Sequence, residues 1–167
     1  RARLGDAALV IEGKPADDNL YKIVINKDGV ESTPDNSLKM LGNYAVIDKV
    51  KETYGEKVCA ISIGPAGEMK MSAASIAFTD MEQRPTRHAG RGGVGAVMGS
   101  KGVKLIVLDD AGMSKRQPAD PDKFREANKM FVQGLKKHAV TGEGLPAYGT
   151  NVLTNVVNEA GGYPTNN

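Results

Sequence analysis

The stretch RHAGRGGVGAVMGSKGVKLIVL, residues 87–108, joins a glycine-rich segment to an apolar run, and the rest of the sequence can be organised around it. Arg87 and Arg91 stand among closely spaced glycines. Glycine lets the backbone approach a ligand, and guanidinium groups donate forked hydrogen bonds that suit phosphate. We therefore expect this segment to bind an anion, followed by a short helix over about 93–99 and a strand over 103–108.

Two nucleotide-binding patterns compete with this interpretation. Gly93, Gly95 and Gly99 match a variant of the dinucleotide fingerprint, but that motif should follow a buried strand, whereas the preceding DMEQRPTRH is polar. The run GAVMGSK, residues 95–101, is too short for a P-loop, and its Ser precedes its Lys. A structural alternative is a turn that packs a helix against a strand, with both arginines solvated. The residues alone favour phosphate without naming the molecule that carries it.

Composition sets the outer limits. The chain has 167 residues, of which 40% are hydrophobic and 25% charged, and these are values of a globular domain. The formal net charge of +2 provides no dominant basic field, so we expect no nucleic-acid partner. There is no run long enough to span a bilayer and no signal-peptide pattern, which favours a cytoplasmic protein with no membrane partner.

Before the glycine-rich stretch, the pattern alternates between short strands and turns. We expect strands at 8–12, around 20–26 with a hairpin turn at Asp28-Gly29, over VCAISI (58–63) and over MSAASIAF (71–78). GPAG (64–67) should form a tight turn. A helix is predicted from Asn43 to Tyr54, with Gly55 after its end and an apolar face formed by Ala45, Val46, Val50 and Tyr54.

After residue 110 the sequence becomes polar and then helical. Asp120-Pro121 is a helix start, and a helix should run to about His138. Residues 139–150 are expected to be a loop, and 150–160 a final short helix. The predicted fold class is α+β: a mixed β-sheet half-domain with packed helices over 1–110, then a short helical tail over 111–167.

Few other residues suggest chemistry. Cys59 is the single cysteine and is expected to be a small buried hydrophobe. Glu68 could orient a loop or simply be solvated, and His88 is interpreted as a positional residue. No nucleophile–base pair, paired carboxylates or metal-ligand spacing is found, so we assign no catalytic and no metal-binding residue. The methionines are interpreted as packing residues, with Met98 facing the strand at 103–108; the others are Met69, Met71 and Met81.

The motif RHAGRGGVGAVMGSK, followed by an apolar strand, closely resembles the signature of the tungsten-containing aldehyde:ferredoxin oxidoreductases. LGDAALVIEGKP, VCAISIGPAGE and the closing GYPTNN resemble further segments of that family in the same order. The resemblance implies that 1–110 is the C-terminal part of the tungstopterin-binding N-terminal domain, and that 111–167 starts the helical domain.

The resemblance also implies a function. Such enzymes oxidise an aldehyde to a carboxylic acid at tungsten or molybdenum held by two pyranopterins, and pass electrons through a [4Fe-4S] cluster to ferredoxin. It implies that an arginine matching Arg87 and backbone groups around His88, Ala89 and Gly90 contact the pterin phosphates and the Mg²⁺ that bridges them. The anion-binding interpretation of the residues adds Arg91, Gly92 and Gly93, so the cofactor-binding residues expected are Arg87, His88, Ala89, Gly90, Arg91, Gly92 and Gly93.

The departures from the family pattern limit what this chain should do alone. The family's first pterin loop and its cluster cysteines have no counterpart here, and Cys59 does not match a cluster ligand. We therefore expect a fragment or subunit of the enzyme, inactive alone, that associates with the remainder, a partner subunit or itself. A cofactor-free interaction module and a nucleotide-binding domain remain alternatives.

Overall fold

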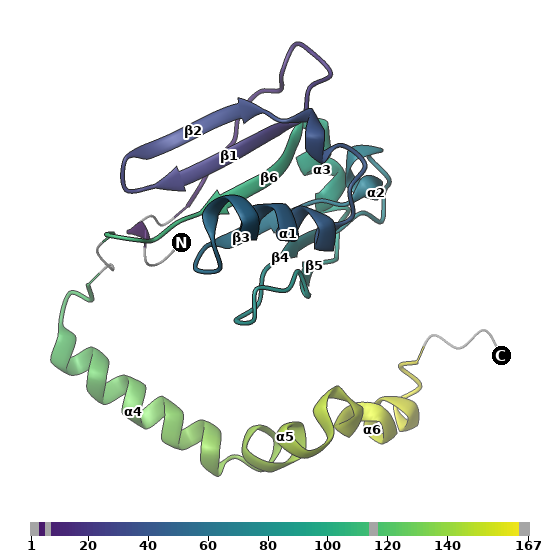
Figure 1. Ribbon diagram of the computed structural model, residues 1–167. Coiled ribbons are helices and arrows are strands. Elements are labelled where there is room, and N and C mark those ends of the chain that lie inside the picture. Colours follow the sequence, from purple (N-terminus) through teal and green to yellow (C-terminus); the bar gives the residue numbers. More distant parts are fainter. Residues whose placement is uncertain (1–3, 6–7, 114–116, 164–167) are drawn as a thin grey trace. The chain divides into compact units, whose positions relative to one another are not determined.

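The computed structural model describes residues 4–5, 8–113 and 117–163 of the chain (Figure 1). The chain divides into two compact units, Arg1–Arg116 and Gln117–Asn167. The first unit contains a six-stranded mixed sheet and its helices, and the second is helical, so the expected α+β class is confirmed.

The sheet of the first unit has the strand order β2-β1-β6-β3-β4-β5. Its edge strands are β2 (Gly29–Pro34) and β5 (Arg87–Ala89), and β1 (Tyr21–Asn26) pairs with β2 as the predicted hairpin. The central strand β6 (Val103–Leu108) runs parallel to β1 and antiparallel to β3 (Cys59–Ser62). β4 (Ile76–Phe78) lies between β3 and β5, antiparallel to both.

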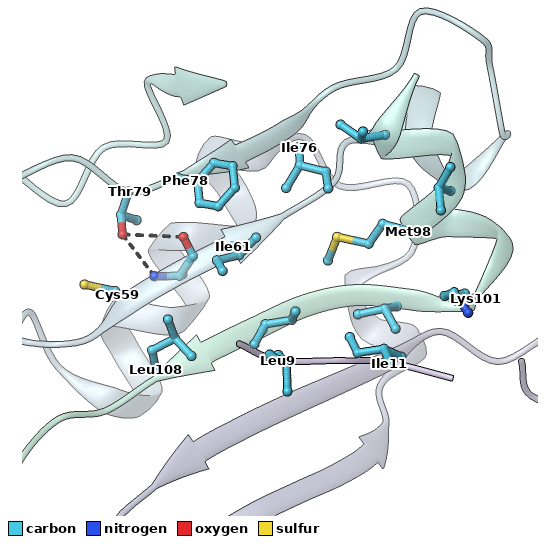
Figure 2. A pocket seen from close by; sticks show the side chains of 15 residues that line it. Leu9, Ile11, Cys59, Ile61, Ile76, Phe78, Thr79, Met98, Lys101 and Leu108 are labelled. Carbon is cyan, nitrogen blue, oxygen red and sulfur yellow. Dashed lines mark hydrogen bonds between the residues drawn. The ribbon is translucent and has the colours of Figure 1, made fainter. Parts of the chain in front are cut away.

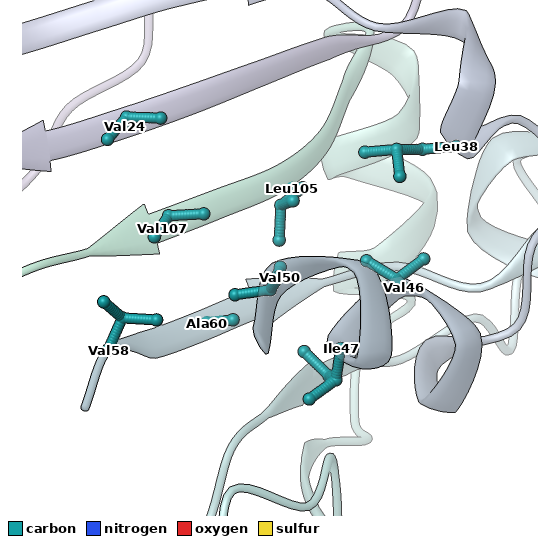
Figure 3. Close-up of a cluster of buried hydrophobic side chains, with 9 residues drawn as sticks. All are labelled: Val24, Leu38, Val46, Ile47, Val50, Val58, Ala60, Leu105 and Val107. Carbon is teal, nitrogen blue, oxygen red and sulfur yellow. The ribbon is translucent and has the colours of Figure 1, made fainter. Parts of the chain in front are cut away.

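One face of the sheet is covered by α1 (Asn43–Tyr54), which has the predicted bounds and ends at Gly55 with a φ of 78° (Figure 3). Val46, Ile47 and Val50 are at most 3% exposed, and each fully buried aliphatic side chain contributes about 1.5–3 kcal/mol to folding. They pack against strand residues that include Leu105 and Val107. Ala45 was predicted to lie on the apolar face of this helix, but it is exposed. Ile47, which was not predicted there, is buried against the sheet.

The opposite face carries α3 (Val94–Ser100), and the predicted contact of Met98 with β6 is confirmed. Met98 belongs to a second apolar cluster with Ile23, Val103 and Ile106. Alternation along β6 separates the two clusters, since Leu105 and Val107 point to the α1 face and Ile106 to the α3 face.

Other predictions about local structure were wrong or incomplete. Residues 8–12 form no strand. The side chains of Leu9 and Ile11 lie against the α3 face of the sheet, but the backbone of this segment does not pair with any strand. The tight turn predicted for GPAG is present, since the Gly67 amide donates to Gly64 O at 3.0 Å, but it is also the first turn of a short helix that was not predicted, α2 (Pro65–Glu68). The strand predicted over 71–78 is confined to β4, since the segment before it contacts the glycine-rich loop instead.

Buried positions were also misjudged. Cys59 is exposed, because the first residue of β3 points to the incompletely covered α3 face. Three methionines expected to pack are exposed on the surface: Met69, Met71 and Met81.

The second unit begins with α4 (Pro121–Lys137). The predicted cap at Asp120 is present, since its carboxylate accepts a hydrogen bond from the Lys123 amide at 3.0 Å. Residues predicted to be a loop are helical instead, as a π-helix over Ala139–Gly144, α5 (Leu145–Tyr148) and a 3-10 helix over Gly149–Leu153. The last helix, α6, covers Thr154–Glu159. Among its described residues none is buried, and exposed apolar side chains such as Phe124 and Phe131 line α4. The PTNN end lies outside the described residues.

Candidate anion-binding loop

The glycine-rich stretch begins on the edge strand β5. Register pairs Arg87 with Phe78 and His88 with Ala77 across the β4–β5 ribbon. Directly paired residues share a face, and neighbours in a strand alternate, so Arg87 and His88 point to opposite faces. Arg87 therefore shares the α3 face of the sheet with Phe78, and it is exposed.

The connection from β4 to β5 is held by Asp80. Its carboxylate accepts from the amides of Glu82 at 2.8 Å and Arg84 at 3.0 Å, and from the Thr86 hydroxyl at 2.8 Å. The hydrogen bond from the Arg84 amide, and after it the one from the Thr86 hydroxyl, contribute most to holding the pKa of Asp80 well below its usual range. This closed loop fixes the strand that presents Arg87.

His88 is engaged within the ribbon. Its Nδ1 lies 2.9 Å from Oγ of Ser75, the residue that precedes β4. The contact joins diagonal neighbours on one face of the ribbon. The geometry therefore agrees with the positional role expected for His88, since one ring nitrogen is already used in a contact inside the protein.

After β5 the chain bends through Gly90, Arg91 and two residues with left-handed backbone, Gly92 (φ 76°) and Gly93 (φ 65°). A Cβ at Gly93 would overlap the carbonyl oxygen of Ser72, so the backbones touch there. Gly90 differs, since a Cβ there would meet nothing within 4 Å and its φ lies outside the left-handed range. The fold therefore gives no reason for glycine at position 90.

The main-chain amides of this bend are available to a ligand. In the described part of the chain, the amides of Arg91, Gly92 and Gly93 have no hydrogen-bond acceptor, whereas that of Gly95 donates to Ala74 O at 3.0 Å. Arg91 is also exposed. An exposed bend with free amides and two flanking guanidinium groups has the chemistry of an anion site.

The seven predicted site residues form one continuous surface segment. Most are exposed, while Ala89 and Gly93 are half-buried. α3, which follows, has only seven residues, so the dipole contribution expected from the sequence is small. Within the described residues there is no group of three or more His, Cys, Asp or Glu side chains placed to hold a metal. The segment presents hydrogen-bond donors of the kind that anions accept from, but it offers no acid–base pair.

An apolar groove of about 660 Å³ lies on the α3 face beside this loop (Figure 2). Its lining comes from β3, β4, β6, α3 and the segment before Gly13, and includes Leu9, Ile61, Phe78 and Met98. Cys59 lies at its margin. The hydroxyl of Thr79 is already used, because it accepts from the Ala60 amide at 3.0 Å. The groove therefore offers apolar surface rather than polar ligands.

A buried ion pair was not found by sequence reasoning. Lys104 is 0% exposed, and its Nζ donates to a carboxylate oxygen of Glu68 and to Leu41 O at 2.8 Å. Desolvation lowers the pKa of Lys104, and the carboxylate partly opposes that effect. The signal in the sequence was a single charged residue within the apolar run VKLIVL. Glu68, left open between a solvated and an orienting residue, is thus a buried partner.

The sheet topology argues against a dinucleotide fingerprint at the loop. β5 and β6, which flank the loop and α3, are separated in the sheet by β3 and β4. Successive antiparallel pairings make β5 and β6 run in opposite directions. A fingerprint needs two parallel strands joined by the helix. Gly95 and Gly99 are also explained by packing, against Ser75 and Gly67 respectively.

In the part of the chain that the structure describes, no helix has the length and apolar character needed to cross a bilayer.

Known proteins resemble nearly the whole chain. It is 44% identical over 163 residues to the tungsten-containing aldehyde ferredoxin oxidoreductase of Pyrococcus horikoshii, covering 96% of this chain and 25% of the relative. The corresponding protein of Pyrococcus furiosus is 42% identical over 167 residues, covering 98% of this chain and 26% of the relative. The chain thus spans about a quarter of the length of these curated relatives.

A solved structure agrees with the fold. The active site complex BamBC of benzoyl coenzyme A reductase, in complex with 1,5-dienoyl-CoA, matches with a TM-score of 0.64 and 30% identity. The match covers 74% of this chain and 18% of that one. Residues 2–110 match the family described as "Aldehyde ferredoxin oxidoreductase, N-terminal domain". The chain therefore belongs to the aldehyde ferredoxin oxidoreductase family, as its motifs indicated.

Proposed function

We propose that this chain is a fragment or subunit of an aldehyde:ferredoxin oxidoreductase-like enzyme, and that its loop Arg87–Gly93 holds the phosphate groups of a bis-pyranopterin tungsten cofactor. Residues 1–110 serve as the C-terminal part of the pterin-binding domain, and 111–167 as the start of the helical domain. The cofactor supplies the redox chemistry that converts an aldehyde to a carboxylic acid. A [4Fe-4S] cluster elsewhere in the enzyme, ferredoxin as electron acceptor and a cytoplasmic location complete the proposal.

One observation carries the proposal. The amides of Arg91, Gly92 and Gly93 have no internal acceptor among the described residues, and they lie on an exposed bend flanked by Arg87 and Arg91. Phosphate oxygens accept hydrogen bonds from both kinds of donor. Carbonyl oxygens of the same bend are suitable ligands for a bridging Mg²⁺, which prefers oxygen and binds phosphates.

The residues of this chain bind and orient in this proposal, and they carry no proton or electron. Arg87 and Arg91 neutralise phosphate charge, and Gly90 leaves room for the ligand. The isolated chain is expected to oxidise no aldehyde, because the cluster ligands and the other pterin contacts belong to the remainder of the enzyme. Aldehyde-dependent dye reduction by the purified chain would contradict that expectation.

The test replaces Arg87 in the complete enzyme. Arg87→Ala should lower tungsten content per protein while leaving the melting temperature nearly unchanged, because an exposed side chain adds little to stability. Arg125→Ala, which removes an exposed arginine from α4, is the matched control and should retain tungsten. Equal tungsten content in Arg87→Ala and the parent enzyme would remove Arg87 from the site.

A further inference from the structure

Lys104 is unusual because a lysine side chain lies completely buried in the central strand of a small sheet. The pairing of β6 with β1 shifts register here: Tyr21 pairs with Val103 and Lys22 with Leu105, so Lys104 is the extra residue of a bulge. A bulge redirects a side chain out of the regular alternation. Here it accompanies the contact of the ammonium group with Leu41 O and the carboxylate of Glu68.

Glu68 extends this contact to two other segments. It is the last residue of α2, and both of its carboxylate oxygens accept from the Met40 amide, at 2.8 and 3.1 Å. Met40 itself has a φ of 59°, a left-handed backbone that an ordinary side chain rarely adopts. The pair therefore joins β6, α2 and the segment before α1 through atoms that are all hydrogen-bonded.

α2 in turn supports α3, the helix that follows the anion loop. The two helices touch backbone to backbone, since a Cβ on Gly99 would overlap the carbonyl oxygen of Gly67. A Cβ on Gly67 would lie 3.1 Å from the carbonyl oxygen of Gly95. With no side chains between them, a displacement of α2 cannot be absorbed by rotamer changes and is passed to α3. The loop ends at Gly93, directly before α3.

We propose that Lys104 and Glu68 are positioning residues for the anion loop: their buried pair fixes α2, and α2 fixes α3 and the bend at Gly90–Gly93. This inference rests on the proposed function, because it concerns the same loop. A buried ion pair contributes less to stability than apolar residues of similar size often would. Its contribution here is positional, because the ammonium group of Lys104 meets the carboxylate of Glu68 only when α2 lies against β6.

The test uses the full 167-residue chain labelled with ¹⁵N, and inorganic pyrophosphate as the probe. Lys104→Met keeps the length of the side chain and removes the charge, and Glu68→Gln is a milder change that keeps an acceptor for Met40. Ile47→Ala is the control, because it destabilises the buried core on the α1 face without touching α2 or α3. All variants are compared at a temperature at which each is folded.

In Lys104→Met the amide signals of Gly90, Arg91, Gly92 and Gly93 should move, and the pyrophosphate Kd should rise at least tenfold. Glu68→Gln should produce the same changes to a smaller degree, and it decides the question if Lys104→Met does not fold. Ile47→Ala should leave both the loop signals and the Kd unchanged. A loop that keeps its signals and its Kd in the pair variants would overturn the inference, as would equal changes in Ile47→Ala.

The two proposals can fail separately. If the parent chain does not bind pyrophosphate while the pair variants still displace the loop signals, the positioning role stands and the phosphate assignment is wrong. If the parent binds pyrophosphate and the pair variants bind it equally well with unmoved signals, the phosphate assignment stands and the positioning role is wrong.

Discussion

Arg87 and His88 are adjacent in the sequence, yet their side chains lie on opposite faces of the β4–β5 ribbon. Arg87 is paired with Phe78, and His88 is paired with Ala77. Both residues are exposed, but the histidine ring contacts Ser75 Oγ at 2.9 Å, whereas the Arg87 guanidinium group makes no hydrogen bond or ion pair among the described residues. Two basic residues that look equivalent in the motif therefore have different surroundings, and they should respond differently to substitution.

Replacing His88 should affect the ribbon more than the anion. We expect His88→Ala and Ser75→Ala to lower the free energy of unfolding by about 0.5–1.5 kcal/mol each, with the double variant no worse than the larger single one, because both remove one hydrogen bond. Urea unfolding of the four proteins measures this coupling. Additive losses would mean that the contact contributes nothing.

Pyrophosphate affinity should fall in Arg87→Ala and change much less in His88→Ala.

The glycines of the loop separate into those needed by the fold and one that is not. Gly90→Ala should leave the melting temperature unchanged, because the new methyl group would meet only open space. Under the proposed function it should weaken pyrophosphate binding, since the methyl group would fill open space that the proposal assigns to the ligand. Titration calorimetry and thermal unfolding measure the two effects.

Gly93→Ala provides the contrast, because its left-handed φ and the Ser72 carbonyl both oppose a side chain. It should lower stability. If Gly90→Ala binds pyrophosphate as well as the parent chain does, the ligand does not approach position 90.

The contact between α2 and α3 depends on Gly99. A methyl group there would overlap the Gly67 carbonyl, so Gly99→Ala should lower the free energy of unfolding by about 1–3 kcal/mol or more. Gly134→Ala, in the last turn of α4 with open space around it, is the matched control and should not lower stability, because alanine favours a helix. Equal stability of Gly99→Ala and the parent would show that the two helices separate without cost.

Local patterns predicted much of this fold, and tertiary contacts account for what they missed. The helix at 43–54 and the strand at 103–108 were predicted with their observed bounds, because periodicity and the flanking glycines are local signals. The apolar pattern of residues 8–12 predicted a strand, but Leu9 and Ile11 contribute side chains to the groove on the sheet face instead, a contact that no local pattern specifies.

The site shows the same division. The exposed loop at 87–93 follows from its glycines and arginines, whereas the Lys104–Glu68 pair depends on a strand bulge and on segments far apart in the sequence. No local pattern specifies a contact of that kind.

The exposure of Cys59 gives a direct chemical test of the open groove. A maleimide should label the folded chain stoichiometrically without denaturant, because the thiol lies at the exposed start of β3. Mass spectrometry measures the product, and Cys59→Ser is the control that should remain unlabelled. Labelling that requires urea would show that the groove face is covered in solution, for instance by a second copy of the chain.

The loop that presents Arg87 should be sensitive to acid through Asp80. Its pKa lies below the ordinary value of 3.8, so the folded chain holds this carboxylate in its charged form more strongly than the unfolded chain does. The resulting stabilisation is fully present above about pH 5 and is lost progressively as the pH falls below about 4.

Asp80→Asn removes this titration while keeping one acceptor. The difference in free energy of unfolding between parent and variant should therefore be constant from pH 5 to 7 and shrink toward pH 3, as measured by urea unfolding at each pH. A difference that stays the same down to pH 3 would show that the Arg84 amide and the Thr86 hydroxyl do not hold the charged carboxylate, and the β4–β5 connection would then need another explanation.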